Sequence, residues 1–322
     1  MRRRRRLTTV VAAALAGAVP TAFPAWPAGA AASQAAAICS SSSHPALAAR
    51  IGRDILPARR GRVSAAAVGV NDPGMGVVCW LNRSWRFDSA SVVKVTILGA
   101  LLRRTEDQHR YLTGIEAARA RAMITRSDND AASALWAELG PGYLRHFLAL
   151  AGMAHTSLGP GGEWGLTQIT ADDEVRLLRL LLNPSAVLAA TSRSYALRLM
   201  AKVTPAQRWG VPAGAPTSLT AHVKNGWLPE ATHGWRIHSI GCFTGHRGGY
   251  SVVVLTQDNP TMAYGIATIE AIARAINHDL RPAAASVVPS RHPGQSRRGG
   301  RPTSTSQRCR TFPGRTTRPR KR

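Results

Sequence analysis

The sequence lacks the patterns on which several common kinds of active site depend. Its four cysteines have no CxxC spacing and its ten histidines form no HExxH motif, so neither residue type supports a zinc site. No G-x-S-x-G segment occurs, which argues against an α/β-hydrolase. We therefore expect no metal ion and no organic cofactor.

Acidic residues are also scarce, with 17 Asp and Glu against 42 Lys and Arg and a formal net charge of +25. Such a balance is typical of nucleic-acid-binding proteins. The positive charge is concentrated at the ends, however, because Arg2–Arg6 and residues 281–322 together hold 17 of the basic residues and no acidic one. Residues 7–280 carry a net charge of only +8. We therefore expect no nucleic-acid partner.

Both ends of the chain are predicted to lie outside the folded domain. Arg2–Arg6 are followed by the apolar stretch Leu7–Phe23 and then by small residues, which is typical of a secretory signal peptide over residues 1–37. The apolar stretch is short and contains a proline, so no stable membrane span is expected after cleavage. Residues 281–322 lack apolar periodicity, which predicts a disordered basic tail. We expect a secreted or extracytoplasmic monomer.

An exported chain permits disulfide bonds, and the cysteines leave two pairings open. Cys39 can pair with Cys79 or with Cys242, whereas Cys309 lies in the predicted tail. The sequence alone does not choose between these pairings.

The strand pattern indicates one domain over residues 38–280. Two apolar segments, 62–70 and 76–82, flank an Asn-Asp-Pro-Gly turn and predict a hairpin. Further strands are predicted near 219–225, 235–243 and 249–256.

Helical periodicity covers the rest of the domain. One helix is predicted over Pro45–Arg59 and another over about 262–277, on either side of the strands. Helices between the two groups of strands are predicted at 91–104, 115–125, 129–139, 141–151, 171–183 and 192–202. We predict an α/β fold of the α+β type, in which an antiparallel five-stranded sheet is flanked by the N- and C-terminal helices and an all-helical lobe is inserted at about 88–215. A functional site would lie in the cleft between sheet and lobe.

The first candidate for chemistry is Ser91, three residues ahead of Lys94 in the segment FDSASVVKV (87–95). Asp88 and Ser89 are N-cap candidates, which places Ser91 in the first turn of a helix. Residues i and i+3 share a helix face, so Ser91 Oγ and Lys94 Nζ can approach each other. A lysine whose pKa is lowered by apolar neighbours can act as the base that a serine nucleophile needs. The alternative is an ordinary helix start with one surface lysine.

Two further segments carry polar residues in suggestive settings. Ser127 and Asn129 in SDND can relay a proton and hold a substrate amide, or can simply begin a helix. Lys224 in VKNGW can attract a substrate carboxylate, or can be a solvated lysine on an edge strand. Gly226 would allow close backbone approach of a ligand, and the Trp227 N–H would complete an oxyanion hole with the Ser91 N–H.

Taken together, SxxK, SDN and K-x-G follow one another in the order found in penicillin-recognising serine enzymes. Over roughly residues 44–278 the sequence resembles the class A β-lactamase-like serine hydrolases, in the segments FDSASVVKV, MITRSDNDAASALW and HSIGCFTGHRGGYSVVVLTQD. The resemblance implies a β-lactamase/transpeptidase-like fold. It further implies that Ser91 is the acylated nucleophile, Lys94 part of the general base and Ser127 the proton shuttle. Asn129 would position the substrate amide and Lys224 would bind the carboxylate.

The sequence departs from the family pattern at two positions of the site. Asn225 stands where a hydroxyl is usual, although its amide can donate a hydrogen bond. No E-x-x-L-N motif is present, and Glu163 in GGEWG is the nearest candidate for the glutamate that activates the deacylating water. The alternative for Glu163 is a surface loop charge, in which case deacylation would be slow. Arg236 or His238 could assist with a carboxylate.

We therefore expect an exported serine hydrolase that acts on cyclic or peptide amides through a Ser91 acyl-enzyme. Hydrolysis of a β-lactam ring is the first hypothesis for its reaction. Two alternatives stay open within this class, a D-Ala-D-Ala carboxypeptidase and a slow-deacylating penicillin-binding protein. From another class, the chain could be a non-catalytic cell-wall-binding module. The expected partner is a small β-lactam or a D-Ala-D-Ala-type peptide.

Overall fold

The computed structural model describes residues 36–245 and 248–280. The predicted basic tail and all but the last two residues of the predicted signal peptide lie outside these residues. Within the described part of the chain, no helix is both long enough and apolar enough to span a membrane.

The core of the fold is an antiparallel sheet of six strands, in the order β1-β3-β2-β8-β7-β6. The strands are β1 (Ile38–Ser40), β2 (Ala65–Asp72), β3 (Val77–Leu81), β6 (Thr220–Pro229), β7 (Trp235–Gly245) and β8 (Gly248–Asn259). Five of them confirm the five predicted strands. The sixth, β1, was missed because it is three residues long and follows an alanine-rich stretch without alternating polarity.

A disulfide bond joins β1 to the neighbouring strand β3. It links Cys39 to Cys79, which lie directly opposite each other in the two strands. This is the first of the two pairings that the sequence left open. Cys242 is a free thiol on β7, and its complete burial raises the pKa of the thiol.

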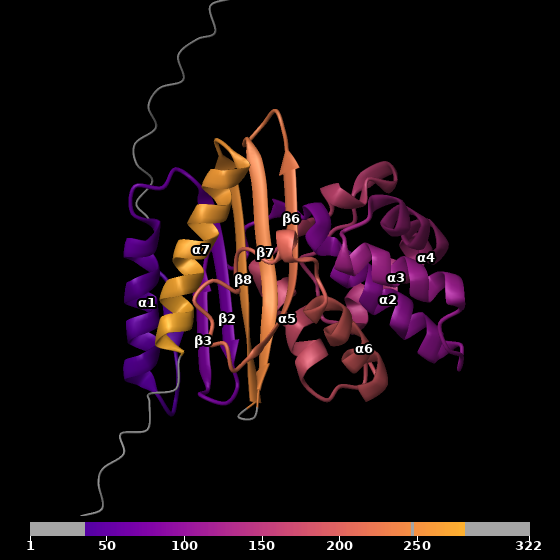
Figure 1. Cartoon of the computed structure of the whole chain (residues 1–322), viewed down its shortest axis with the longest axis horizontal. Coiled ribbons are helices and arrows are strands. Elements are labelled where there is room, and N and C mark those ends of the chain that lie inside the picture. Colours follow the sequence, from indigo (N-terminus) through magenta and orange to yellow (C-terminus); the bar gives the residue numbers. More distant parts are fainter. Residues whose placement is uncertain (1–35, 246–247, 281–322) are drawn as a thin grey trace, which may run out of the picture. The chain divides into compact units, whose positions relative to one another are not determined.

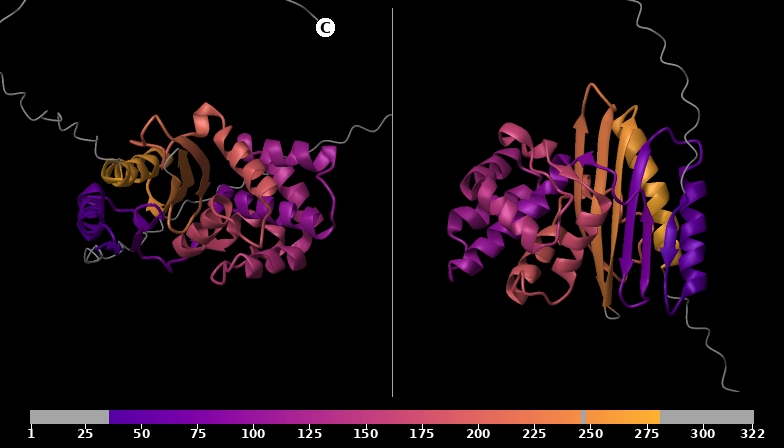
Figure 2. Two further views of the ribbon diagram at one scale, coloured as in Figure 1. Left: turned by 90° about the horizontal axis from the view of Figure 1, so that it is seen from below. Right: turned by 180° about the vertical axis from the view of Figure 1, so that it is seen from behind.

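Helices cover both faces of the sheet (Figures 1 and 2). Helix α1 (Pro45–Arg59) and helix α7 (Met262–Asp279) lie side by side on one face, as predicted for the N- and C-terminal helices. An ion pair of 2.8 Å between Arg50 and Asp279 joins them. Helix α5 (Ala171–Leu182) packs on the opposite face, where its Val175 approaches Gly69 of β2.

The predicted helical lobe is present between β3 and β6. Its other helices are α2 (Lys94–Asp107), α3 (Gly114–Thr125), α4 (Asn129–Leu150) and α6 (Ala190–Ala201). The two helices predicted at 129–139 and 141–151 form the single element α4, which is kinked at Gly140 (φ 70°) immediately before Pro141. A two-stranded ribbon of β4 (Phe87–Asp88) and β5 (Gln168–Ile169) was not predicted, because two-residue strands carry no periodic signal.

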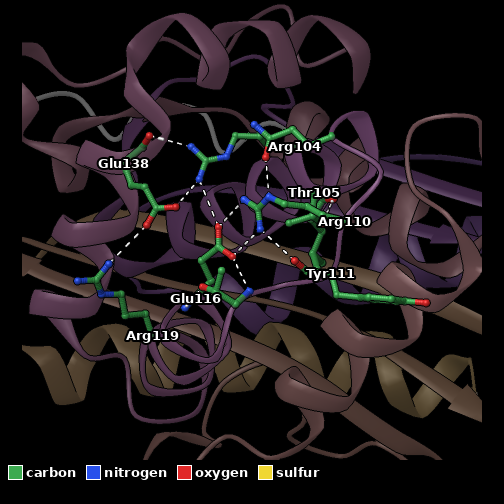
Figure 3. A network of polar contacts seen from close by, with 10 residues as sticks. Arg104, Thr105, Arg110, Tyr111, Glu116, Arg119 and Glu138 are labelled. Atoms are coloured by element: carbon green, nitrogen blue, oxygen red, sulfur yellow. Dashed lines mark hydrogen bonds and ion pairs between the residues drawn. The ribbon is translucent and has the colours of Figure 1, made fainter.

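A network of ion pairs ties three helices of the lobe together (Figure 3). At its centre is Glu116 of α3, whose side chain is only 5% exposed. The carboxylate accepts two hydrogen bonds of 2.7 Å from Arg110 and one of 2.7 Å from the Thr113 N–H. Arg104 of α2 connects Glu116 to Glu138 of α4. The network therefore fixes α3 against its neighbours.

We expect Glu116→Gln to destabilise the protein at pH 7 by about 2 kcal/mol, because it removes charge-assisted hydrogen bonds from a nearly buried site. The bonds from Arg110, followed by those from Thr113, hold the pKa of Glu116 well below its usual value. A depressed carboxyl pKa contributes its full stability above the unfolded-state value of about 4.3; this contribution decreases as pH falls below that value and disappears once pH falls through the lower folded-state pKa.

Urea unfolding at pH 7 and at pH 3.5 measures this contribution. The difference between wild type and Glu116→Gln should shrink at the lower pH. Glu270→Gln, in the exposed pair with Arg274, is the matched control and should change stability by less than about 1 kcal/mol. An undiminished difference at pH 3.5 would contradict the assignment.

Candidate functional site

Ser91 lies in a short 3₁₀ helix, Ala90–Val93, that leads into α2. Ala90 has φ 46°, a left-handed conformation that L-residues rarely adopt. The predicted capping does not occur, because the Ser89 hydroxyl donates to backbone carbonyls and Asp88 forms an ion pair with Arg236. Ser91 lines the cleft, and its hydroxyl makes no hydrogen bond within the described residues.

Lys94, at the start of α2, is completely buried. Its Nζ donates to Ser127 O at 2.6 Å, to Asn129 Oδ1 at 2.7 Å and to Ser127 Oγ at 3.2 Å. Burial lowers the pKa of Lys94 to about 8, against the charge of Asp128, which raises it. A substantial fraction of Lys94 is therefore neutral just above neutral pH, as a general base requires.

Ser127 stands between two buried lysines. Lys224 of β6 is 1% exposed, and its Nζ donates to Ser127 Oγ at 3.0 Å and to the Asn225 carbonyl at 2.7 Å. Burial and then the charge of Lys94 lower the pKa of Lys224 well below its usual value. Two positive charges so close to one hydroxyl repel each other, which disfavours the state in which both amines are protonated. The Ser127 hydroxyl is placed to pass a proton between them.

Asn225 and Gly226 have structural roles that the sequence did not predict. The Asn225 amide donates to Gln207 O at 2.9 Å and to Trp209 O at 2.8 Å, so its two N–H groups already hold the 207–209 segment. A methyl group at Gly226 would lie 2.9 Å from Ser91 N. The close backbone approach expected at Gly226 is therefore made by the turn that carries Ser91.

The cleft has a volume of about 480 Å³ and lies where the sheet meets the lobe. Of the predicted site residues, five line it: Ser91, Ser127, Asn129, Glu163 and Trp227. Lys94 and Lys224 are buried and reach it through Ser127, whereas Asn225 and Gly226 are not among its lining residues. The remaining lining residues are Ala90, Arg126, Ser133, Trp164, Gly165, Leu166, Gln207, Leu228 and Glu230.

Sequence reasoning missed Trp164, which follows Glu163 directly. The Trp164 ring centroid lies 4.6 Å from Lys94 Nζ, a cation–π distance. Its indole N–H donates to Ser133 Oγ of α4 at 3.0 Å, which fixes the ring in place. The exposed Glu163 side chain makes no hydrogen bond within the described residues. The aromatic ring, and no carboxylate, is thus the contact that this loop makes with Lys94.

Arg236 and His238, which the sequence suggested could assist in binding a substrate carboxylate, both contact Asp88 instead. The buried Arg236 forms an ion pair of 2.8 Å with Asp88. The His238 ring contacts Asp88 O at 2.8 Å, and burial lowers the pKa of His238 to about 4. Both residues therefore hold β7 against the segment that precedes Ser91. In residues 36–245 and 248–280, no three His, Cys, Asp or Glu side chains cluster in a way that could hold a metal ion.

The antiparallel sheet with flanking helices and an inserted helical lobe is a β-lactamase-like fold, and Ser91 and Ser127 line its cleft. Residues 118–280 match the model of the β-lactamase enzyme family, and the chain belongs to this family. No curated protein matches the chain.

Solved structures of β-lactamases, several of them described as class A, share the fold. One from Bacteroides cellulosilyticus is 15% identical, with 72% of this chain and 97% of that chain covered and a TM-score of 0.64. A β-lactamase from Sphaerobacter thermophilus is 20% identical, with coverage of 70% and 95% and a TM-score of 0.59. A mutant of the class A enzyme of the last common ancestor of Gram-negative bacteria is 21% identical, with coverage of 70% and 97% and a TM-score of 0.60.

Proposed function

We propose that the protein is an exported serine hydrolase that opens β-lactam rings through an acyl-enzyme on Ser91. The observation that carries this proposal is the Ser127 hydroxyl held between two buried lysines beside an unpaired Ser91 hydroxyl. Export is supported by the signal-like N-terminus and by the Cys39–Cys79 disulfide, since disulfides persist in oxidising compartments.

In the proposed acylation, Lys94 accepts a proton from the nucleophile and Ser127 donates a proton to the leaving group. Neutral Lys94 takes the hydroxyl proton of Ser91 while Ser91 Oγ forms a bond to the lactam carbonyl carbon. The backbone N–H groups of Ser91 and Trp227 stabilise the oxyanion. As the C–N bond breaks, the Ser127 hydroxyl gives its proton to the leaving nitrogen and is reprotonated from a lysine. Lys224 keeps the Ser127 hydroxyl in place through its hydrogen bond of 3.0 Å, and Asn129 holds the substrate amide.

A second candidate, slow release of the acyl group, is favoured by a specific observation. Among the described residues, no carboxylate accepts a hydrogen bond from Lys94 Nζ, and Trp164, directly after Glu163, places an aromatic ring there instead. Without a carboxylate to activate water, the ester would persist. A slow-deacylating penicillin-binding protein or a D-Ala-D-Ala carboxypeptidase would then be the natural role.

Intact-protein mass spectrometry with a chromogenic β-lactam distinguishes these functions. A transient adduct with turnover identifies a hydrolase, whereas a stable adduct identifies a slow-deacylating penicillin binder. Release of D-alanine from a D-Ala-D-Ala peptide identifies a carboxypeptidase. Absence of adduct, of turnover and of peptide cleavage would leave only the non-catalytic wall-binding module.

We expect Glu163→Gln to leave the lifetime of the acyl-enzyme within about twofold of the wild-type value, as is usual for a solvated surface charge. The structural reason is that the Glu163 side chain is exposed and makes no hydrogen bond to any residue that the structure describes. The measurement is the decay of the adduct after excess β-lactam is removed, with Glu230→Gln at the same cleft as the control. A lifetime lengthened by about tenfold or more in Glu163→Gln alone would assign Glu163 as the deacylation base.

A further inference from the structure

A second cavity, of about 320 Å³, lies apart from the catalytic cleft and is formed by α3, α6 and the residue after α6. Its lining residues are Arg121, Thr125, Tyr195, Arg198, Leu199 and Lys202. Half of these side chains carry a positive charge and none carries a negative one. The cavity is therefore electropositive as well as concave.

The three cations of this cavity have no internal counter-charge. Arg121, Arg198 and Lys202 are exposed, and none of their side chains forms a hydrogen bond or ion pair with an acceptor in the described part of the chain. This contrasts with Arg104 and Arg110 of the same lobe, which are paired with carboxylates. Like charges gathered around one cavity repel one another, and an anion bound there would relieve that repulsion.

A simpler explanation of the three cations is that they neutralise the partial negative charge at the C-terminal ends of α3 and α6. The terminal carbonyls have other partners, however. Thr125 O accepts from Thr204 N at 2.9 Å, and Ala201 O accepts from Arg208 Nη1 at 2.7 Å. The last carbonyl of each helix is thus satisfied without the three cations, whose side-chain N–H groups have no acceptor in the described residues.

Tyr195 adds a neutral donor to the cavity. Its hydroxyl makes no hydrogen bond within the described residues, and the Arg198 guanidinium lies 5.9 Å from the ring centroid. Burial raises the pKa of Tyr195, while the charges of Arg121 and Arg198 lower it, so both guanidinium groups lie near the phenol. The buried Leu199 supplies an apolar wall.

We propose that this cavity is a phosphate-binding site, in which Arg121 and Arg198 contact the oxyanion and Lys202 and Tyr195 complete its shell. Guanidinium groups match the geometry of phosphate oxygens and are the preferred partners of this anion. The volume is at the lower end for ligand cavities, which suits a free phosphate or the phosphate of a small ester, such as a polyol phosphate. The site does not depend on acylation of Ser91.

Calorimetric titration of the full-length protein at constant ionic strength tests the site, with inorganic phosphate, glycerol 3-phosphate and a glycerol phosphodiester as probes. Saturable binding is expected. Arg121→Gln and Arg198→Gln should each weaken it by about tenfold, and Tyr195→Phe by about threefold. The matched control is Arg145→Gln on α4, an exposed arginine that likewise has no acceptor in the described residues, and it should change binding by less than about twofold.

Two outcomes support the site and identify the source of the phosphate. Tighter binding of the esters indicates a phosphate ester, and equal binding of all three probes indicates the free ion. Binding that survives both arginine substitutions belongs to the other basic segments and overturns the proposal. The proposal is also overturned if Arg145→Gln and Arg198→Gln weaken phosphate binding equally, or if the wild type shows no saturable binding. Circular dichroism checks that each variant is folded, and Lys202→Gln replaces any that is not.

Discussion

Ser91→Ala should eliminate the covalent adduct with a β-lactam and lower turnover by at least about 10³-fold, because no other group can accept the acyl chain at that position. Ser91 lines the cleft in the 3₁₀ helix before α2, three residues ahead of Lys94, and its hydroxyl makes no hydrogen bond within the described residues. The loss should appear in the acylation rate, with little change in stability, since the hydroxyl makes no internal hydrogen bond.

Intact mass and peptide mapping after incubation with the β-lactam provide the measurement. Ser194→Ala, at an exposed position on α6, is the matched control and should retain the full adduct. An adduct that persists in Ser91→Ala and maps to another residue would refute the proposed nucleophile. A wild type without any adduct would instead remove the acyl-enzyme proposal as a whole.

Lys94→Ala should reduce acylation by a similar factor of about 10³, because the serine then has no base and Ser127 loses one of its two lysine partners. In the wild type, the rate should depend on the neutral form of Lys94. Acylation kcat/KM should therefore fall tenfold per pH unit well below the Lys94 pKa of about 8 and level off above it.

Asp128→Asn provides a test of this assignment without removing the base. The charge of Asp128 raises the pKa of Lys94, so its neutralisation should move the midpoint of the pH profile down by about half a unit. Asparagine keeps the N-cap bond that Asp128 makes to Ala131 N, so helix α4 should be preserved. A midpoint that stays in place, or moves up, would mean that another group controls the profile.

The local elements of the fold could be predicted because their signals lie within single segments. The strands on either side of the Asn-Asp-Pro-Gly turn and the SxxK helix start are examples, and each was recovered within a few residues. Even the division of residues 129–151 into two predicted helices has a counterpart in the kink at Gly140. The strands that were missed, β1, β4 and β5, are each too short for periodicity to reveal.

The site itself depends on contacts that join distant parts of the chain. The order of SxxK, SDN and K-x-G identified Lys94, Ser127 and Lys224, but not that one hydroxyl is shared by both amines across separations of 33 and 97 residues. Strand periodicity also could not show that the 207–209 segment covers Asn225. Trp164 was overlooked for the same reason, since only the folded loop brings its ring over Lys94.

The missing side chain at Gly226 has a mechanical consequence. At Gly226 the backbone of β6 packs directly against the backbone of the turn that carries Ser91. The Ser91 N–H and the Trp227 N–H therefore belong to two segments in direct contact. Separation of the sheet from the lobe at this contact would therefore move the two N–H groups of the proposed oxyanion hole apart. The Glu163–Leu166 segment of the cleft is attached to the same turn, because the Ser89 hydroxyl donates to Trp164 O and Gly165 O.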